Sequence, residues 1–386
     1  MHAIEPTRDL TPDERLEAHG RRPNFIKQIL IEAHRQKASD IRLEPLSDRL
    51  VVRLRVAGAI REFRNLSYEQ EGNKSFASEV VTEIKRLSGL DTFTRKILQD
   101  GSFRYSETAS TYRVTVSPGS GFGECSVLRV NRDEDIPSLT NLGLSEQALA
   151  DFRWASRQHQ GLIIVTGPTG SGKTTTLQAC LFELDLKHTA VVTAEAPVER
   201  YLPYVLHQEI TPRFSWTDAI SFSLRADPDV ILIGELKEKE PAKKMVEGAN
   251  TGHLVFTTLH TNSAVDTISR LIGFDIDPED IADNILMITA QRLMKKLCDY
   301  CKLDYGSGFT RNPAGCDKCN LGTVKKGKVP LVEYLKNPDP DLIKKRDYDG
   351  LRASLSQNLL SEMKNAVESG ILDFKIYEDA LKKGKF

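Results

Sequence analysis

This sequence of 386 residues lacks the features that mark membrane, secreted and nucleic-acid-binding proteins. No apolar run approaches the ~20 residues that a membrane-spanning helix needs. The first residues include no apolar segment typical of a secretory signal peptide, so we expect a cytoplasmic protein that reaches a membrane only through partners. The formal net charge of −1 gives no reason to expect stable binding to nucleic acid.

Cysteine is scarce as well, but four of the six cysteines are grouped. They form two Cys-x-x-Cys pairs, Cys298 with Cys301 and Cys316 with Cys319. In a reducing compartment such pairs indicate a metal before a disulfide. Four thiolates fill the tetrahedral shell of Zn²⁺ and leave no open position, so the sequence predicts a structural zinc site. The alternative is a set of buried free thiols.

The motif that decides the function begins in an apolar run, LIIVT at 162–166, which predicts a buried strand. GPTGSGKTTT follows at once and contains the phosphate loop G-x-x-x-x-G-K-[ST] between a strand and a helix start. Lys173 is placed to reach the β- and γ-phosphates of a nucleotide, and the Thr174 hydroxyl to hold Mg²⁺. The predicted nucleotide-binding residues are Gly167, Pro168, Thr169, Gly170, Ser171, Gly172, Lys173, Thr174 and Thr175.

Four more residues are candidates for chemistry at this site. Glu235 ends the apolar strand expected at 230–233, where a carboxylate can activate the attacking water; the alternative is a cap on the next helix. Glu195 and Glu199 follow another strand end and can hold Mg²⁺ through water or orient the attacking water, unless they belong to a solvated loop. His260 follows a third strand and can sense phosphate, although a single histidine more often has a structural role.

The spacing of apolar residues predicts the surrounding elements. We expect a helix that begins at Asn24 and a chain that turns helical from about residue 281. Two further helices are expected at 74–88 and 142–160. The expected strands cover residues 49–56, 59–63, 103–106, 111–117, 125–130, 162–166, 190–193, 230–233 and 254–257. The alternation of strands and helices in the second half is typical of a parallel sheet with helices on both faces.

Over about residues 36–340 the chain resembles the ATPase family that powers type II secretion and type IV pilus assembly. The motifs occur in the family's order. ASDIRLEP resembles the opening ASDIHIEP, QDG resembles QDGR, and GPTGSGKTTT matches throughout. The acidic, LRxDPDxxxxGE and histidine motifs and the AQRL…CxxC run follow, at Thr193–Glu199, Leu224–Glu235, Thr251–Asn262 and Ala290–Cys301.

This resemblance implies a hexameric ATPase motor that uses ATP, Mg²⁺ and Zn²⁺ and acts on an inner-membrane platform protein. It implies an α/β fold with a small N-terminal domain, a RecA-like core, a tetracysteine zinc insert and C-terminal helices. Arg113 and Arg129 match, by position, the N-terminal arginines that reach the phosphates; the alternative is two solvated strand residues. The expected parts are a flexible arm at 1–22, an N-terminal domain at 23–136, an ATPase core at 137–295, a zinc subdomain at 296–330 and a helical region at 331–386.

Some positions depart from the family pattern. Ala57 and Ala196 replace aspartates, Ser221 replaces an arginine, and Lys237-Glu238 replaces Arg-Asp. Lysine lacks the planar fork of arginine, so a lost pair between subunits would lower turnover. The additional N-terminal domain of many assembly ATPases is not seen, unless 1–22 serve in its place. The tetracysteine motif favours assembly or secretion over retraction; the alternatives are a DNA-transfer or DNA-uptake motor and a nucleotide-gated scaffold subunit with little turnover.

Overall fold

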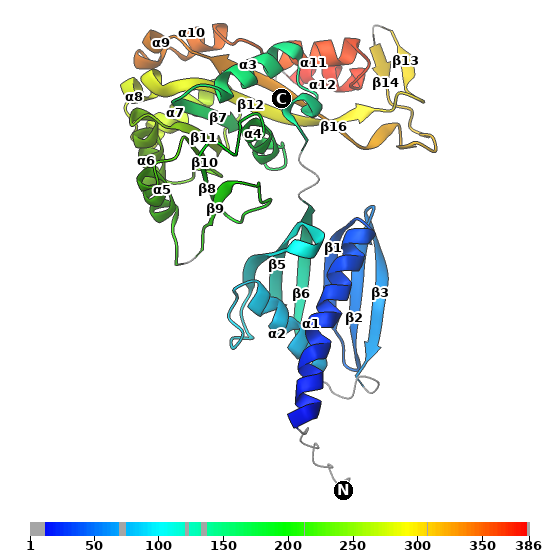
Figure 1. The fold of residues 1–386 in the computed structure, drawn as a ribbon. Coiled ribbons are helices and arrows are strands. Elements are labelled where there is room, and N and C mark those ends of the chain that lie inside the picture. The colour runs from blue at the N-terminus through cyan, green and yellow to red at the C-terminus, as the bar shows by residue number, and fades with distance from the viewer. Residues whose placement is uncertain are drawn as a thin grey trace. The chain divides into compact units, whose positions relative to one another are not determined.

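The computed structural model describes residues 12–68, 75–119, 123–132, 137–211, 213–306 and 308–383. The chain divides into two compact units (Figure 1). The first consists of 1–135 with 197–202, and the second of 136–196 with 203–386. In the part that the structure describes, no helix is both long and apolar enough to cross a membrane.

The first unit is a six-stranded sheet in the order β3-β2-β1-β6-β5-β4, and each pairing between neighbouring strands is antiparallel. Two helices pack on one face of this sheet (Figure 1) and share a core with its inward-facing residues. The elements are α1 (Pro12–Arg35), β1 (Ala38–Pro45), β2 (Arg49–Val56), β3 (Ala59–Ser67), α2 (Ser75–Leu87), β4 (Gln99–Tyr105), β5 (Ser110–Pro118) and β6 (Glu124–Arg132).

Two expectations for this unit need correction. The first helix begins at Pro12 and not at Asn24, so 12–22 are helical although we expected a flexible arm; residues 1–11 lie outside the described residues. The strand at Ala38–Pro45 was not expected, although its charged and apolar residues alternate from Asp40 on, with Ile41, Leu43 and Pro45 buried; it pairs with β2 and β6. The arginines of β2 do alternate with its buried residues, as the pattern predicts.

The second unit contains an eight-stranded sheet in the order β15-β16-β12-β7-β11-β10-β8-β9. The six strands from β12 to β9 are parallel to their neighbours, whereas β16 is antiparallel to β12. Its strands are β7 (Gly161–Thr166), β8 (Val191–Glu195), β9 (Val205–Glu209), β10 (Val230–Ile233), β11 (Leu254–Leu259), β12 (Ile285–Leu297), β15 (Cys319–Asn320) and β16 (Thr323–Lys336). A separate antiparallel pair is formed by β13 (Leu303–Tyr305) and β14 (Gly308–Thr310).

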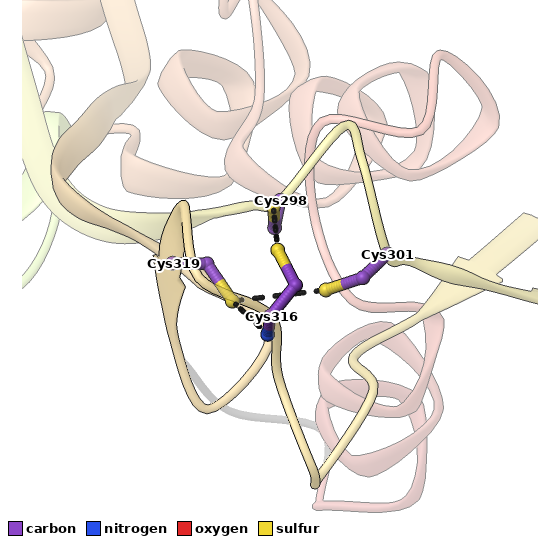
Figure 2. Close-up of side chains that lie close together, drawn as sticks. All are labelled: Cys298, Cys301, Cys316 and Cys319. Atoms are coloured by element: carbon purple, nitrogen blue, oxygen red, sulfur yellow. Dashed lines mark hydrogen bonds between the residues drawn. The ribbon is translucent and has the colours of Figure 1, made fainter.

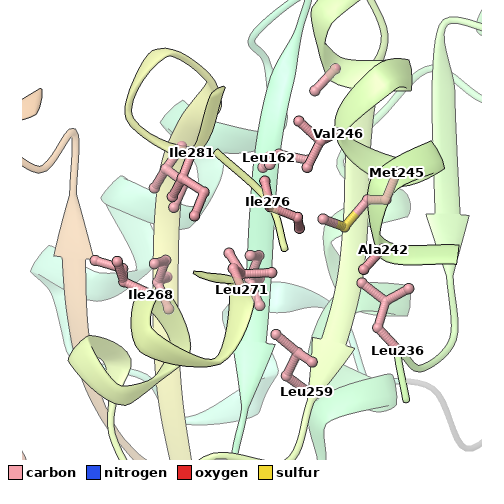
Figure 3. Packing of buried hydrophobic residues seen from close by; sticks show 14 of the residues in the cluster. Leu162, Leu236, Ala242, Met245, Val246, Leu259, Ile268, Leu271, Ile276 and Ile281 are labelled. Atoms are coloured by element: carbon pink, nitrogen blue, oxygen red, sulfur yellow. The ribbon is translucent and has the colours of Figure 1, made fainter. Parts of the chain in front are cut away.

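Helices cover both faces of this sheet, as predicted from the alternation of strands and helices. One apolar cluster joins β7, β10, β11, β12 and β16 to six helices, α5 to α10, and Figure 3 shows Leu162 of β7 among side chains of these helices. The opposite face carries α4, which contacts β7 and β11 and packs against α3. The helices are α3 (Glu146–Ser156), α4 (Lys173–Leu181), α5 (Trp216–Arg225), α6 (Lys239–Asn250), α7 (Ala264–Gly273), α8 (Pro278–Asn284), α9 (Pro340–Lys344), α10 (Tyr348–Ala353), α11 (Leu359–Glu368) and α12 (Phe374–Lys383).

The expectation of a helical chain from about residue 281 is wrong over 285–336. Helix α8 ends at Asn284, and the next residues form β12, which pairs with β7 on one side and β16 on the other. Leu, Met, Ala, Gln and Lys favour helices, but burial between two strands outweighs that preference. The expected helical C-terminus is present as α9 to α12. The expected borders at 295/296 and 330/331 fall inside β12 and β16.

Candidate functional site

The phosphate loop follows β7 and leads into α4, as the sequence predicts. β7 is buried along its whole length, and α4 begins at Lys173. Gly167, Gly170 and Gly172 have φ angles of 142°, 78° and 86°, which glycine adopts without steric cost. The loop residues Pro168, Thr169 and Gly170 are exposed, whereas Ser171 is buried and Thr174 and Thr175 are half-buried in the first turn of α4.

The strand order brings the predicted acidic and histidine segments beside this loop. β7, β11, β10 and β8 are consecutive parallel neighbours, so their carboxyl ends lie on one edge of the sheet. His260 follows β11, Glu235 follows β10, and Glu195 ends β8. This is the edge at which open α/β sheets bind their ligands.

Three predicted residues meet at that edge. Lys173 Nζ lies 3.5 Å from His260 Nδ1, and His260 Nε2 lies 3.6 Å from Glu235 Oε2. Thr258 fixes the backbone beside Glu235, because its hydroxyl donates to Gly234 O at 2.6 Å and its carbonyl accepts from Leu236 N at 3.1 Å. The lysine, the histidine and the carboxylate therefore form one continuous group.

Lys173 is buried and is bound by its own loop. Its Nζ donates to the carbonyl oxygens of Gly167 at 3.0 Å and Pro168 at 3.2 Å. Burial lowers the pKa of Lys173 below its ordinary value, while the Glu235 carboxylate opposes that shift. An anionic phosphate at the loop would add to the effect of Glu235 and favour the charged ammonium.

Glu235 has a second cationic neighbour, Lys237, one of the departures from the family pattern. Lys237 Nζ donates to Glu235 Oε1 at 2.5 Å. The Lys237 side chain is 65% exposed and that of Glu235 26%, so water screens the pair. Such a surface pair contributes roughly 0–1 kcal/mol, and Glu235 can leave it for a bound water at little cost.

Glu195 is buried in a hydrogen-bonded cluster that includes a residue the sequence reasoning missed. The Thr193 hydroxyl donates to Glu195 Oε1 at 2.7 Å. His207 Nδ1 lies 3.0 Å from the same oxygen and 2.9 Å from the Thr193 hydroxyl. Because the carboxylate can only accept, this geometry places a proton on Nδ1. No spacing signal marks His207: it becomes a neighbour only because β9, which we did not predict, pairs with β8.

The other predicted residues, Glu199, Arg113 and Arg129, belong to the first unit. Glu199 is exposed and lies in 197–202, which belongs to the first unit. Arg113 and Arg129 are exposed partners across β5 and β6 in the same unit, and Arg129 Nε lies 3.6 Å from Asp40 Oδ1. At the amino end of β11, His253 Nδ1 lies 3.0 Å from Gly248 O, which is a structural contact at the end of α6.

A second candidate site is formed by the four grouped cysteines, which point toward one another in Figure 2. Their sulfur atoms all lie within 4.8 Å of one another. Cys298 and Cys316 are separated by 3.8 Å, and Cys301 and Cys319 by 3.7 Å, between sulfurs. A tetrahedron with Zn–S bonds of ~2.3 Å has edges of about 3.8 Å, so these residues fit a metal ion.

Backbone groups near the cluster favour a thiolate at Cys319. Burial raises the pKa of that thiol, but donation from Cys316 N at 3.1 Å and Gly322 N at 3.4 Å, together with the neighbouring Cys316 and Cys301 thiols, lowers it to about 7. Gly322 has a φ of 83°, and a Cβ there would lie 2.4 Å from Asn312 O. Glycine is thus required for the turn that directs this N–H group at the sulfur.

With this geometry established, comparison with known proteins identifies the family. A family model described as "Type II/IV secretion system protein" matches residues 16–378. The chain belongs to the type II/IV secretion system protein family. It is 37% identical over 314 residues to the type II secretion system protein HxcR of Pseudomonas aeruginosa, covering 80% of this chain and 65% of HxcR.

Other members of the family show the same relation. The chain is 34% identical over 365 residues to the protein transport protein HofB homologue of Haemophilus influenzae, covering 93% of this chain and 73% of that protein. It is 32% identical over 333 residues to the type IV pilus assembly ATPase PilB of Thermus thermophilus, covering 81% of this chain and 37% of PilB. The chain thus spans less than two thirds of HxcR and little more than a third of PilB.

Solved structures of this type support the fold. The pilus retraction motor PilT, solved with bound ADP, has a TM-score of 0.70 at 24% identity, covering 92% of this chain and 96% of that chain. The ATPase DotB of Legionella pneumophila has a TM-score of 0.67 at 22% identity, covering 99% of each chain. At these identities the likeness is one of fold, and it confirms the expected fold class.

Proposed function

We propose that this chain is a Mg²⁺-dependent ATPase. The observation that carries the proposal is the continuous group of Lys173, His260 and Glu235 beside the phosphate loop. A loop of this sequence between a strand and a helix binds the phosphates of a nucleotide. The Glu235 carboxylate follows β10, which is separated from β7 by only one strand, β11, and it can supply the base that hydrolysis needs.

In the proposed reaction, water attacks the γ-phosphorus, the bond from the γ-phosphorus to the bridging oxygen breaks, and ADP leaves. Glu235 accepts the proton of the attacking water after leaving Lys237. Lys173 exchanges the carbonyl oxygens of Gly167 and Pro168 for phosphate oxygens. Mg²⁺, held with the Thr174 hydroxyl, would neutralise charge on the β- and γ-phosphates. His260, in contact with both Lys173 and Glu235, registers whether the γ-phosphate is present.

Four further residues are assigned to this proposal from sequence position and burial. Glu195, with one carboxylate oxygen engaged by Thr193 and His207, would orient water around a bound Mg²⁺. Glu199 acts with it from the following loop. Arg113 and Arg129 supply positive charge to the phosphates from the first unit.

We further propose that hydrolysis drives pilus assembly or protein secretion. Family membership and the similarity to the type II secretion protein HxcR and the pilus assembly ATPase PilB support this role. The protein would act in the cytoplasm as a homo-hexamer on an inner-membrane platform protein. The four cysteines would hold one structural Zn²⁺, which the separations between their sulfurs support.

Two substitutions test the ATPase assignment because they separate binding from turnover. Lys173→Ala should abolish ATP binding, since it removes the buried ammonium of the phosphate loop. Glu235→Gln should retain binding and lose hydrolysis by about 10²–10⁴-fold, the contribution typical of a general base. Equilibrium binding of a fluorescent ATP analogue and phosphate release measure the two properties. Glu238→Gln, the same change at an exposed carboxylate three residues away, is the matched control.

Normal hydrolysis by Glu235→Gln would contradict the role of Glu235. ATP binding by wild-type protein with no turnover above that of Glu235→Gln would favour a nucleotide-gated scaffold subunit over a motor.

A further inference from the structure

Gln291 connects β12 to the phosphate loop through its side-chain amide. Its Nε2 donates to Ser171 O at 2.6 Å, and its Oε1 accepts from the Thr176 hydroxyl at 2.9 Å. All three residues are buried, with exposures of 1%, 2% and 0%. The amide therefore joins the last part of the loop to the first turn of α4.

One glycine of the loop is required by this contact, and a second lies close to it. A Cβ at Gly167 would lie 2.4 Å from Gln291 O, and one at Gly172 would lie 3.0 Å from Gln291 Nε2. Real Cβ atoms do not approach a backbone oxygen as closely as 2.4 Å, so the loop rests on β12 only because residue 167 is glycine, whereas a side chain at 172 would displace the Gln291 amide. The backbone and side chain of Gln291 together form the floor of the phosphate loop.

The next residue, Arg292, holds the second loop of the site. Its Nη2 donates to Asn262 O at 2.8 Å, and its Nη1 lies 3.2 Å from Gln291 O. Asn262 follows His260 by two residues and precedes α7. Burial lowers the pKa of Arg292, and Glu333 on the neighbouring strand β16 opposes that shift. Consecutive residues of β12 thus bind the two loops that carry Lys173 and His260.

We propose that Gln291 and Arg292 are positioning residues of the ATPase site, with separable effects. Gln291 sets the shape of the phosphate loop and so the affinity for nucleotide. Arg292 sets the position of the His260 loop and so the rate of hydrolysis once nucleotide is bound. The inference rests on the proposed ATPase function. It adds that β12 positions the two loops of the site.

The test measures the Kd of a fluorescent ATP analogue with Mg²⁺ and the kcat of phosphate release on the full chain. Gln291→Ala should raise the Kd about tenfold, because a buried hydrogen bond is lost at the loop. Gln291→Glu should raise the Kd at least as much. The glutamate carboxylate fills the same space as the amide but cannot donate a hydrogen bond to Ser171 O. If Gln291 served only to fill space, this substitution would leave the Kd unchanged.

Arg292→Met should lower kcat about tenfold and leave the Kd within about twofold, because Asn262 O loses its donor while the phosphate loop keeps Gln291. Arg292→Lys should recover part of kcat, since one N–H donor can still reach the loop. Thr289→Val is the matched control on the same strand: its buried hydroxyl has no hydrogen-bond partner among the described residues. It should leave Kd, kcat and the melting temperature near those of wild type.

Unchanged Kd in both Gln291 variants, with normal binding by wild type, would overturn the inference and leave the ATPase proposal standing. Nucleotide affinity and kcat that fall together in all four Gln291 and Arg292 variants, in proportion to a lower melting temperature, would also overturn the inference, because this result indicates a purely structural role. Wild-type protein that binds no nucleotide would overturn the ATPase proposal itself, and the positioning roles with it.

Discussion

The turn between β2 and β3 holds an alanine in a conformation that alanine rarely adopts. Ala57 and Gly58 have φ angles of 51° and 87°, the left-handed conformation that a two-residue hairpin turn requires at both positions. Glycine adopts it freely, but for alanine the clash between Cβ and the carbonyl costs roughly 1–2 kcal/mol. Asparagine tolerates it better and is common at this position of such turns.

Ala57→Asn should therefore raise the free energy of unfolding of the first unit by about 1 kcal/mol. Denaturant unfolding followed by circular dichroism measures the change. Ala59→Asn, two residues along and exposed at the start of β3, is the control and should not stabilise. A lower midpoint for Ala57→Asn than for wild type would contradict the interpretation of the turn.

At the residue scale, the sequence predicted the side chains that carry a strong local motif. Lys173, Glu235 and His260 each end or follow an apolar strand, and that pattern indicates the ligand edge. His207 and Gln291 were not singled out for a role, because each acts through a hydrogen bond to a segment distant in the chain. Such contacts depend on which strands are neighbours in the sheet. Neither the type nor the spacing of these two residues reveals the order of the strands.

At the element scale, the short apolar strands around the phosphate loop and most strands of the first unit were predictable, whereas β1, β9, β12 and β16 were not. β7 and β10 are short apolar runs and lie where we expected them. β12 is long and contains helix-favouring residues, and its strand conformation comes from β7 and β16. The sequence around the cysteines predicted their grouping, but not that β12 and β16 lead directly into it.

Metal removal should destabilise the segment between these two strands. Residues 298–322 hold only short strands, so the ordered structure there depends strongly on the four thiolates. We expect about one Zn²⁺ per chain by elemental analysis. Cys316→Ser should lose the metal and lower the melting temperature, whereas Cys125→Ser, outside the cluster, should retain it. Fully folded protein without metal would contradict a structural zinc site.

At the scale of the whole molecule, the proposed ATPase residues are divided between two units. Lys173, Glu235 and His260 belong to the second unit, while Arg113 and Arg129 lie exposed on strands of the first. Most helices and strands within each unit follow from the sequence pattern. The sequence pattern does not show which surfaces contact another subunit. An exposed charged residue can face either solvent or a partner, and its sequence pattern is the same in both cases.

If a hexamer completes the site, the hydrolysis rate per protomer should rise steeply with protein concentration and reach a plateau. Arginine charge supplied to the transferring phosphate is worth a factor of about 10³–10⁵ in kcat where it has been measured, so subunits that lack it should be nearly inactive. Steady-state phosphate release over a range of protein concentrations, with Glu235→Gln as the blank, measures this. Arg113→Ala should lower the plateau, and Arg61→Ala, the same change at an exposed position on β3, should not. A rate per protomer that is well above the blank and independent of concentration would mean that one chain holds a complete site, and that hydrolysis does not require a hexamer.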